Sequence, residues 1–337
     1  MIDKFDSKKT SIITISQQNF LPPKINNLGN QENFLKIAKS YKKAVQNNYD
    51  AIIYPELALT SYMVRDIFLN KDFISICLKL NERLITQTKE TILFLPTITK
   101  GSDNKIYNSI ISARNGQIID IYNKQYLPNY SIFNESRYFA EGNKPSIINI
   151  NNIKIGLMIC EDIWYDNIYE YYIHNNVDIC LVSNASPFNK LKQRLRENII
   201  YDKQRKYKDD FIPIIYCNLI SSVEGIIFDG RSIISDKKDI IYKGKFLKEE
   251  DINISIKRQE NNNLIIKVIN KSIERTCKKN NKNIASNKNQ KNNYFININP
   301  EENIKKYEEI DKAILFATQN YLSNNNFTKT VWACRVE

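Results

Sequence analysis

The amino-acid sequence predicts a layered α/β domain in which helices cover β-sheets on both faces. Up to about residue 245, apolar runs rich in β-branched residues alternate with stretches whose apolar residues recur at helical spacing. Several runs, such as 51–54 and 155–159, are apolar throughout, which is typical of strands buried on both faces. The 337 residues, 42% of them hydrophobic, are enough to bury a full core.

Strands are expected where β-branched runs are bounded by turn-forming residues, and helices where an apolar stripe repeats every three or four positions. The expected strands are 11–16, 51–54, 92–95, 107–113, 117–122, 153–159, 178–182, 213–217 and 226–234. The expected helices are 30–47, 74–89, 167–175, 190–207 and 300–322. The last of these begins with Pro300 and two acidic residues, which suits the amino end of a helix.

The formal net charge of +12 raises the question of a nucleic-acid partner. Residues 251–299 hold ten Lys or Arg and only three Asp or Glu, so more than half of the excess lies in one Asn/Lys-rich stretch. Basic and aromatic residues do not alternate regularly there. We therefore interpret 251–299 as a solvated linker and expect no nucleic-acid partner.

Cysteine and histidine usage excludes several kinds of site. The six cysteines form no CxxC pair, so neither a disulfide framework nor a metal site is expected. The single histidine, His174, is not enough for mechanisms that combine imidazole with a Ser-Asp or two-His arrangement, and we assign it no role. No apolar run reaches the roughly 20 residues of a membrane span, and the first residues lack the apolar block of a signal peptide, so a cytoplasmic protein without a membrane partner is expected.

Three expected strands end at a reactive side chain. Glu56 follows 51–54, Lys124 follows 117–122, and Cys160 follows 153–159. Because active sites of α/β folds form at the carboxyl ends of strands, these side chains could converge. A carboxylate can activate a thiol without histidine, and an ammonium can stabilise the oxyanion formed when a thiolate attacks a carbonyl.

Five short segments carry a family resemblance. They are PELALT at 55–60, KQYLPNY at 124–130, RYF at 137–139, ICEDIW at 159–164 and NASP at 184–187. In this order they resemble the nitrilase, or carbon-nitrogen hydrolase, superfamily, and within it the glutaminase domain of glutamine-dependent NAD synthetases. The resemblance covers residues from about 10 to 245. Ser61 and Ser131 stand where that family has glycine.

The resemblance implies a nitrilase-like αββα sandwich with a Cys-Glu-Lys site. Glu56 would be the general base, Cys160 the nucleophile that forms a thioester with glutamine, and Lys124 would hold the oxyanion with a backbone amide near Glu161. The implied substrate-binding residues are Tyr130, Glu135, Ser186 and Lys190. The glutaminase step needs no cofactor, the small-molecule partner would be glutamine, and a homo-oligomer is expected.

The same family resemblance predicts the domain organisation. We expect a glutaminase domain at 1–250, the linker at 251–299, and at 300–337 the incomplete start of an ATP pyrophosphatase domain. That domain would require ATP and magnesium, and its phosphate-binding Ser-Gly-Gly-x-Asp-Ser loop is absent from the sequence. We interpret this as a truncation, with a frame-changing insertion or deletion as its hypothetical cause. A free-standing amidase and an inactive remnant are the alternatives.

Overall fold

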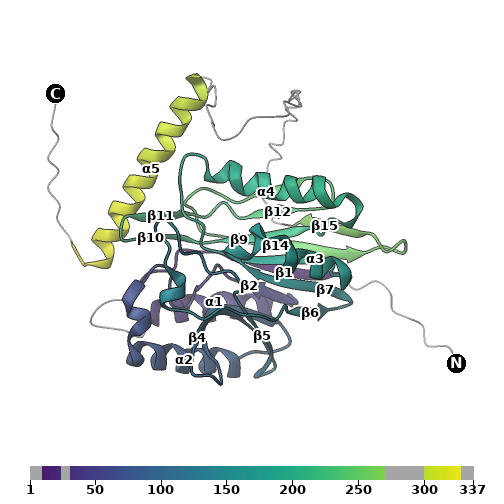
Figure 1. Ribbon diagram of the computed structural model, residues 1–337, viewed down its shortest axis with the longest axis horizontal. Coiled ribbons are helices and arrows are strands. Elements are labelled where there is room, and N and C mark those ends of the chain that lie inside the picture. The colour runs from purple at the N-terminus through teal and green to yellow at the C-terminus, as the bar shows by residue number, and fades with distance from the viewer. Residues whose placement is uncertain (1–9, 24–30, 270–299, 328–337) are drawn as a thin grey trace.

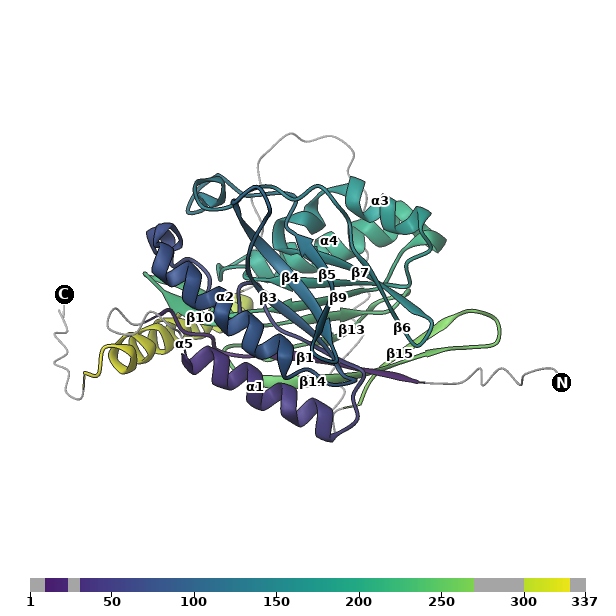
Figure 2. The same ribbon diagram turned by 90° about the horizontal axis from the view of Figure 1, so that it is seen from below.

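The fold consists of two β-sheets packed face to face, with helices on both outer surfaces (Figure 1). The computed structural model describes residues 10–23, 31–269 and 300–327, and in the last helix it describes side chains from Tyr307 onward. Seen from below, helices α1 and α2 lie on one side of the sheets and α3 and α4 on the other (Figure 2).

The first sheet has seven strands in the order β15-β14-β1-β2-β3-β4-β5. Strands β1, β2 and β3 run parallel and are joined through the two helices that cover this sheet, whereas its other neighbouring strands pair antiparallel. The elements are β1 (Ser11–Gln17), α1 (Gln31–Gln46), β2 (Ala51–Ile53), α2 (Lys71–Thr86), β3 (Ile92–Lys100), β4 (Ile106–Arg114), β5 (Gln117–Asn123), β14 (Glu250–Arg258) and β15 (Leu264–Val268).

The second sheet has six strands in the order β13-β12-β9-β8-β7-β6 and repeats the same plan. Strands β7, β8 and β9 are parallel and are joined through α3 and α4. The elements are β6 (Ile147–Ile150), β7 (Ile153–Ile159), α3 (Asp166–His174), β8 (Ile179–Asn184), α4 (Lys192–Tyr207), β9 (Ile214–Asn218), β12 (Ile233–Ser235) and β13 (Ile240–Lys243).

Smaller elements complete the described part of the chain. A two-stranded ribbon, β10 (Ile220–Val223) and β11 (Ile226–Asp229), carries helix α5 (Pro300–Asn324) against it (Figure 1). Four short 3-10 helices are η1 (Arg65–Leu69), η2 (Glu135–Arg137), η3 (Cys160–Trp164) and η4 (Lys208–Asp210).

Apolar side chains form three layers of core. The central layer lies between the two sheets and includes Ile13, Ile53 and Phe94 from one sheet and Leu157 and Leu181 from the other. The outer layers pack α1 and α2 on the first sheet and α3 and α4 on the second. Because the central strands are covered on both faces, they are apolar throughout, and the expected αββα fold is confirmed.

One expected strand, 226–234, is in fact two strands in different sheets. Strand β11 ends at Asp229 and β12 begins at Ile233. Gly230 between them has a φ of +70°, and a Cβ there would lie 2.7 Å from the side chain of Gln17. The backbone therefore turns sharply at a position that only glycine can occupy without strain.

The linker boundary expected at residue 251 is also wrong. Residues 250–258 form β14, which pairs with all seven residues of β1, and 264–268 form β15. Ile252, Ile254 and Ile256 are fully buried on alternate positions of β14. The alternation of isoleucine with polar residues is a strand pattern that the Asn/Lys-rich composition obscured.

The remainder of the expected linker, 270–299, lies outside the described residues, as does the chain end at 328–337. Within the described ranges, no helix combines the length and the apolar character that crossing a membrane requires.

Candidate active site

A buried ammonium lies between two buried carboxylates at the carboxyl ends of the strands. Lys124, directly after β5, places Nζ 2.7 Å from Oε1 of Glu56 and 2.8 Å from Oε1 of Glu135. All three side chains are almost completely excluded from solvent. A buried charge is costly unless it is paired, so this cluster is held together by its own electrostatics.

Glu56 follows β2 and, besides Lys124, is held by donors from two further segments. Nδ2 of Asn108 donates to Oε1 over 2.8 Å, and the backbone N–H of Ala185 donates to Oε2 over 3.0 Å. Asn108 also accepts the backbone N–H of Lys124 on its carbonyl oxygen, over 2.8 Å. Asn108 on β4 thus orients the carboxylate through its side chain and binds the backbone of Lys124 through its own backbone carbonyl.

Cys160 stands at the sharp turn between β7 and η3, with a φ of 45°. This left-handed conformation is unusual for a residue other than glycine and is frequent at functional sites. Burial and then Glu56 raise the pKa of the Cys160 thiol well above its ordinary value, while Lys124 and the backbone of Ala185 lower it. The thiol is therefore protonated at neutral pH and needs a base to become a nucleophile.

Glu135, in η2, binds Lys124 with both oxygens and accepts a hydrogen bond from the hydroxyl of Tyr62. Burial raises the pKa of Glu135, with Lys124 opposing that shift. Two carboxylates that share one ammonium hold it in a fixed position between them. Glu135 thus contributes to the placement of Lys124.

Asp162, two residues after Cys160, is completely buried. Its oxygens accept hydrogen bonds from the backbone N–H groups of Ile159, Gln125 and Tyr126 and from the hydroxyl of Tyr122. Burial raises the pKa of Asp162 from 3.8 to about 6, against the effect of these donors.

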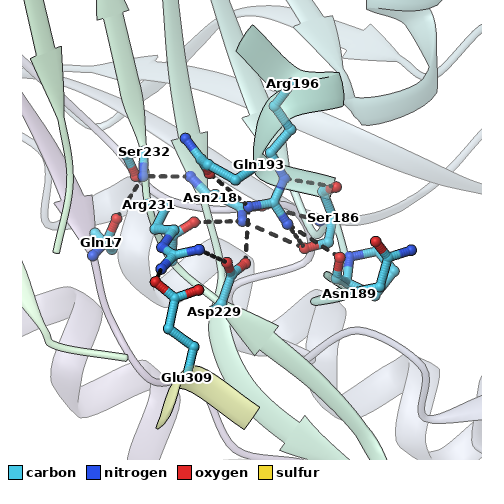
Figure 3. A network of polar contacts seen from close by, with 12 residues as sticks. Gln17, Ser186, Asn189, Gln193, Arg196, Asn218, Asp229, Arg231, Ser232 and Glu309 are labelled. Carbon is cyan, nitrogen blue, oxygen red and sulfur yellow. Dashed lines mark hydrogen bonds and ion pairs between the residues drawn. The ribbon is translucent and has the colours of Figure 1, made fainter. Parts of the chain in front are cut away.

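A buried ion pair supports the segment after β8 (Figure 3). Arg196 of α4 binds Asp229 over 2.8 Å and donates to the backbone oxygens of Ser186 and Pro187 over 2.7 and 3.1 Å. Asn218, at the end of β9, receives the backbone N–H of Ser186 over 2.9 Å. The segment that presents the Ala185 N–H to Glu56 is therefore anchored from two sides.

The same network reaches helix α5. Arg231, beside Asp229, forms an ion pair of 2.6 Å with Glu309 (Figure 3). Ala313 on the same helix is 1% exposed. Among the described side chains, helix α5 is thus attached to the sandwich by this ion pair, by the buried Ala313 and by polar contacts of Tyr307 and Asn320.

A surface pocket of about 390 Å³ is connected to the turn of Cys160 through Tyr130, which lines the pocket and contacts Glu161. It is lined by Tyr130, by Pro187 to Asn189, by Lys192 and by residues of β11. Tyr130 is 53% exposed, and its hydroxyl donates to Oε2 of Glu161 over 3.0 Å.

Some of the site residues predicted from the sequence lie together in the structure, and others lie outside that cluster. The structure brings Glu56, Lys124, Glu135 and the Cys160 thiol into one cluster and places Tyr130 at the pocket. Ser186 is buried, and its Oγ accepts a hydrogen bond from Arg196. Nζ of Lys190 lies 4.9 Å from the centre of the Tyr307 ring, and Lys192 lines the pocket instead.

Sequence reasoning missed Tyr62, Asn108 and Asp162. Asp162 lies within the ICEDIW segment, so a signal for it was present, whereas nothing in the sequence distinguishes Asn108 from other asparagines. Three further cysteines, Cys77, Cys180 and Cys217, are buried and free. Cys277 and Cys334 lie outside the described residues.

Ser61 and Ser131, which stand at the two positions where the resemblance predicts glycine, have the left-handed backbone conformation that glycine favours. Ser61 has a φ of 66° and Ser131 a φ of 56°, both in the left-handed region. The backbone course is thus retained although the side chain makes it less favourable.

Comparisons with a family model and with known proteins agree on one family. The carbon-nitrogen hydrolase family matches residues 13–237. Two similar proteins are the glutamine-dependent NAD(+) synthetases of Aquifex aeolicus, 28% identical over 95% of this chain and 55% of its own length, and of Thermotoga maritima, 28% identical over 90% and 53%. The chain therefore spans about half the length of these relatives.

Solved structures show the same fold. The glutamine-dependent NAD+ synthetase of Acinetobacter baumannii superimposes with a TM-score of 0.73 at 24% identity and covers 94% of this chain and 52% of its own. A carbon-nitrogen hydrolase from Helicobacter pylori superimposes with a TM-score of 0.61 at 18% identity, over 73% of this chain and 88% of its own.

Proposed function

Because the chain belongs to the carbon-nitrogen hydrolase family, we propose that it hydrolyses the side-chain amide of glutamine to glutamate and ammonia. The observation that supports this most directly is the Lys124 ammonium, buried between Glu56 and Glu135 and close enough to Cys160 to affect its thiol. A thiol, a carboxylate base and a cation are the groups that amide hydrolysis through a thioester requires.

The first half of the reaction forms the thioester. Glu56 takes the proton of the Cys160 thiol as sulfur attacks the amide carbon, and the carbonyl oxygen becomes an oxyanion beside Lys124. When the tetrahedral intermediate collapses, the carbon–nitrogen bond breaks, and Glu56 passes its proton to the departing nitrogen, which leaves as ammonia. The acyl group of glutamate remains on sulfur.

The second half releases glutamate. Water attacks the thioester carbon as Glu56 takes a proton from it, and the carbon–sulfur bond then breaks, with the proton returning to the thiolate. The raised pKa of the Cys160 thiol favours its regeneration as a neutral thiol. The second oxygen of the product carboxylate comes from water.

Glutamine as the substrate is supported by the surroundings of the site and by the names of the relatives. The adjoining pocket of about 390 Å³ has room for an amino acid, and Lys192 and the hydroxyl of Tyr130 suit its charged end. The relatives from Aquifex aeolicus and Thermotoga maritima are glutamine-dependent NAD(+) synthetases. We place glutamine with its amide at Cys160 and its α-substituents toward this pocket.

The ammonia would serve an ATP-dependent amidation of nicotinic acid adenine dinucleotide to NAD. This part of the proposal rests on the relatives' names alone, since the chain spans about half of their length. ATP and magnesium would belong to that second reaction, and the residues of the glutaminase step require neither.

The test is a glutaminase assay that measures ammonia and glutamate, with Cys160→Ala, Glu56→Gln and Lys124→Ala as variants. Each variant is expected to lose turnover, whereas Cys77→Ala, which removes a buried thiol of the core, retains it per folded molecule. Turnover by Cys160→Ala at the wild-type rate would refute the mechanism. Hydrolysis of simple amides in preference to glutamine would favour a general amidase, and failure of a glutamine-mimicking electrophile to label Cys160 would favour an inactive remnant.

A further inference from the structure

Asp162 connects two segments that each carry a group of the candidate site. Oδ2 accepts the backbone N–H of Ile159, the residue directly before Cys160, over 2.9 Å. Oδ1 accepts the backbone N–H groups of Gln125 and Tyr126, which directly follow Lys124, over 3.1 and 2.9 Å. One side chain thus binds the turn of the nucleophile and the loop of the lysine together.

Two further contacts join the same segments. The hydroxyl of Tyr122, near the end of β5, donates to Oδ2 of Asp162 over 2.7 Å. Tyr126, in the lysine loop, stacks on Tyr165, directly after η3, with ring centres 3.7 Å apart and planes inclined by 7°. The two segments come from different sheets, so these contacts are what hold them in register at this point.

A local capping role does not account for this arrangement. Capping the first turn of η3 requires only the bond to Ile159, whereas three of the four donors belong to residues 122–126. A carboxylate is also the only side chain of this size that can accept on both oxygens. Asparagine would direct an NH2 group at one set of N–H donors.

We propose that Asp162 is a positioning residue that sets the distance between the Cys160 sulfur and the Lys124 ammonium. The inference rests on the proposed function, because that distance matters only if Lys124 stabilises charge that develops at the carbon attacked by Cys160. Asp162 itself touches neither the substrate nor the reacting atoms. Misplacement of a reacting group by about 1 Å can cost roughly 100-fold in rate.

The first test compares Asp162→Asn with Asp120→Asn. Asp120 is a matched control because it is a carboxylate on β5, the strand that carries Tyr122, and its partly buried hydrogen bond is accepted from Ser146, over 2.7 Å, and from neither segment. With glutamine, Asp162→Asn is expected to lower kcat about 100-fold with little change in KM. Asp120→Asn is expected to leave both constants unchanged. Equal kcat values for the two variants would overturn the proposal.

A second measurement does not depend on glutamine hydrolysis. The pH dependence of Cys160 alkylation by iodoacetamide reports the thiol pKa, which Lys124 lowers. If Asp162→Asn lets Lys124 move away, the alkylation profile shifts to higher pH, and Asp120→Asn keeps the wild-type profile. An unshifted profile in folded Asp162→Asn would overturn the inference even if the wild type hydrolysed no glutamine, while a shifted profile without glutamine hydrolysis would refute the proposed function alone.

Tyr122→Phe covers the case in which Asp162→Asn does not fold. This variant deletes one hydroxyl that donates to Asp162 and keeps the ring in the core. The same upward shift of the alkylation profile, smaller in size, and a several-fold loss of kcat are expected. A wild-type profile and a wild-type kcat in folded Tyr122→Phe would contradict the proposal.

Discussion

The oxygen atoms of Glu56 differ in their surroundings, and this decides how the carboxylate can act as a base. Oε1 accepts hydrogen bonds from the Lys124 ammonium and from the Asn108 amide, whereas Oε2 accepts, among the described residues, only the backbone N–H of Ala185. Oε2 therefore has the more available lone pair. We expect Oε2 to carry the proton that moves between sulfur and nitrogen.

Asn108→Leu tests the support given to Oε1. The substitution keeps the volume of the buried side chain and removes its donor, so Glu56 loses one of its donors. A hydrogen bond to a charged group contributes about 1.5–3 kcal/mol, which corresponds to a loss of about 10- to 100-fold in kcat/KM. Steady-state kinetics on glutamine measures it. A kcat/KM within twofold of the wild type would contradict this role for Asn108.

The stability of the fold is expected to depend on the protonation of Asp162. Its pKa is raised to about 6, so between pH 6 and 4 the folded state binds the proton more tightly than the unfolded state. Acidification therefore stabilises the wild type relative to Asp162→Asn, by at most about 3 kcal/mol. The charged or titratable groups that face Asp162 are Tyr122, Lys124 and Tyr172.

Thermal unfolding at pH 7 and pH 5 measures this dependence. The difference in Tm, wild type minus Asp162→Asn, should rise as the pH falls. Glutamine hydrolysis should change in the opposite direction, since the protonated carboxyl accepts fewer hydrogen bonds. A Tm difference that is independent of pH would show that Asp162 does not titrate in this range.

At the scale of single residues, the proposed reactive side chains could be predicted from the sequence, whereas the side chains that position them could not. Glu56, Lys124 and Cys160 each follow an apolar run, and that position is visible in a linear sequence. The carboxylate that Asn108 binds lies 52 positions away along the chain, and three of the four donors to Asp162 lie 36 to 40 positions away. Such pairs are fixed only when the strands have assembled.

Among the elements, α4 has a structural role that its surface-like composition does not suggest. Arg196 is 1% exposed and pairs with Asp229, which is equally buried. Because the guanidinium also binds the backbone after β8, the helix secures the strand end that supports Glu56. The helix thus contributes to the site without contacting it.

Arg196→Met is expected to lower the free energy of unfolding by up to about 3–5 kcal/mol, because the buried Asp229 carboxylate loses its 2.8 Å ion pair and keeps the longer contact to Arg231, at 3.8 Å. Adding Asp229→Asn should restore part of this loss. Lys206→Met is the matched control: it removes the ion pairs of the same helix with Asp166 and Glu170, whose groups are about half exposed, and it is expected to cost much less stability. Urea unfolding measures all variants. Equal losses for Arg196→Met and Lys206→Met would contradict the assignment.

Helix α5 is expected to detach from the sandwich when its buried face is disturbed. Ala313→Glu introduces a charge at a 1% exposed position, whereas Ile314→Glu introduces the same charge at a neighbouring position that is 55% exposed. Hydrogen exchange of residues 307–324 should accelerate in Ala313→Glu and remain as in the wild type in Ile314→Glu. The same exchange rate in both variants would mean that α5 does not pack through Ala313.

The spacing of apolar residues predicted helices and strands correctly where the surrounding composition was also typical of them. The first four expected helices agree with the structure to within about three residues at each end. Strand β14 was not predicted because its alternating isoleucines stand among asparagines and lysines. The residues of 226–234 predict one strand because no sequence pattern reveals that the chain passes from one sheet to another at Gly230.

For the whole molecule, the residue at which the folded sandwich ends along the chain can be tested with truncated chains. Strand β14 buries three isoleucines against the central core, each contributing about 1.5–3 kcal/mol. Their sum is comparable to the total stability of an ordinary domain, which is about 5–15 kcal/mol. A chain that stops at residue 249 is therefore expected not to fold, whereas one that stops at 269 should.

Circular dichroism during heating distinguishes the two truncated chains. The chain ending at 269 should show one cooperative transition, and the chain ending at 249 none. A cooperative transition in the shorter chain would show that β14 and β15 are accessory to the sandwich and would support a boundary at residue 250.

The two-sheet construction also has a consequence for folding kinetics. The base and the lysine come from the first sheet and the nucleophile from the second, each built on its own strand-helix-strand-helix-strand unit. Either unit could gain its local structure early, but the cluster around Lys124 exists only after the sheets have docked. Recovery of catalysis during refolding should therefore follow this late event and lag behind the return of secondary structure.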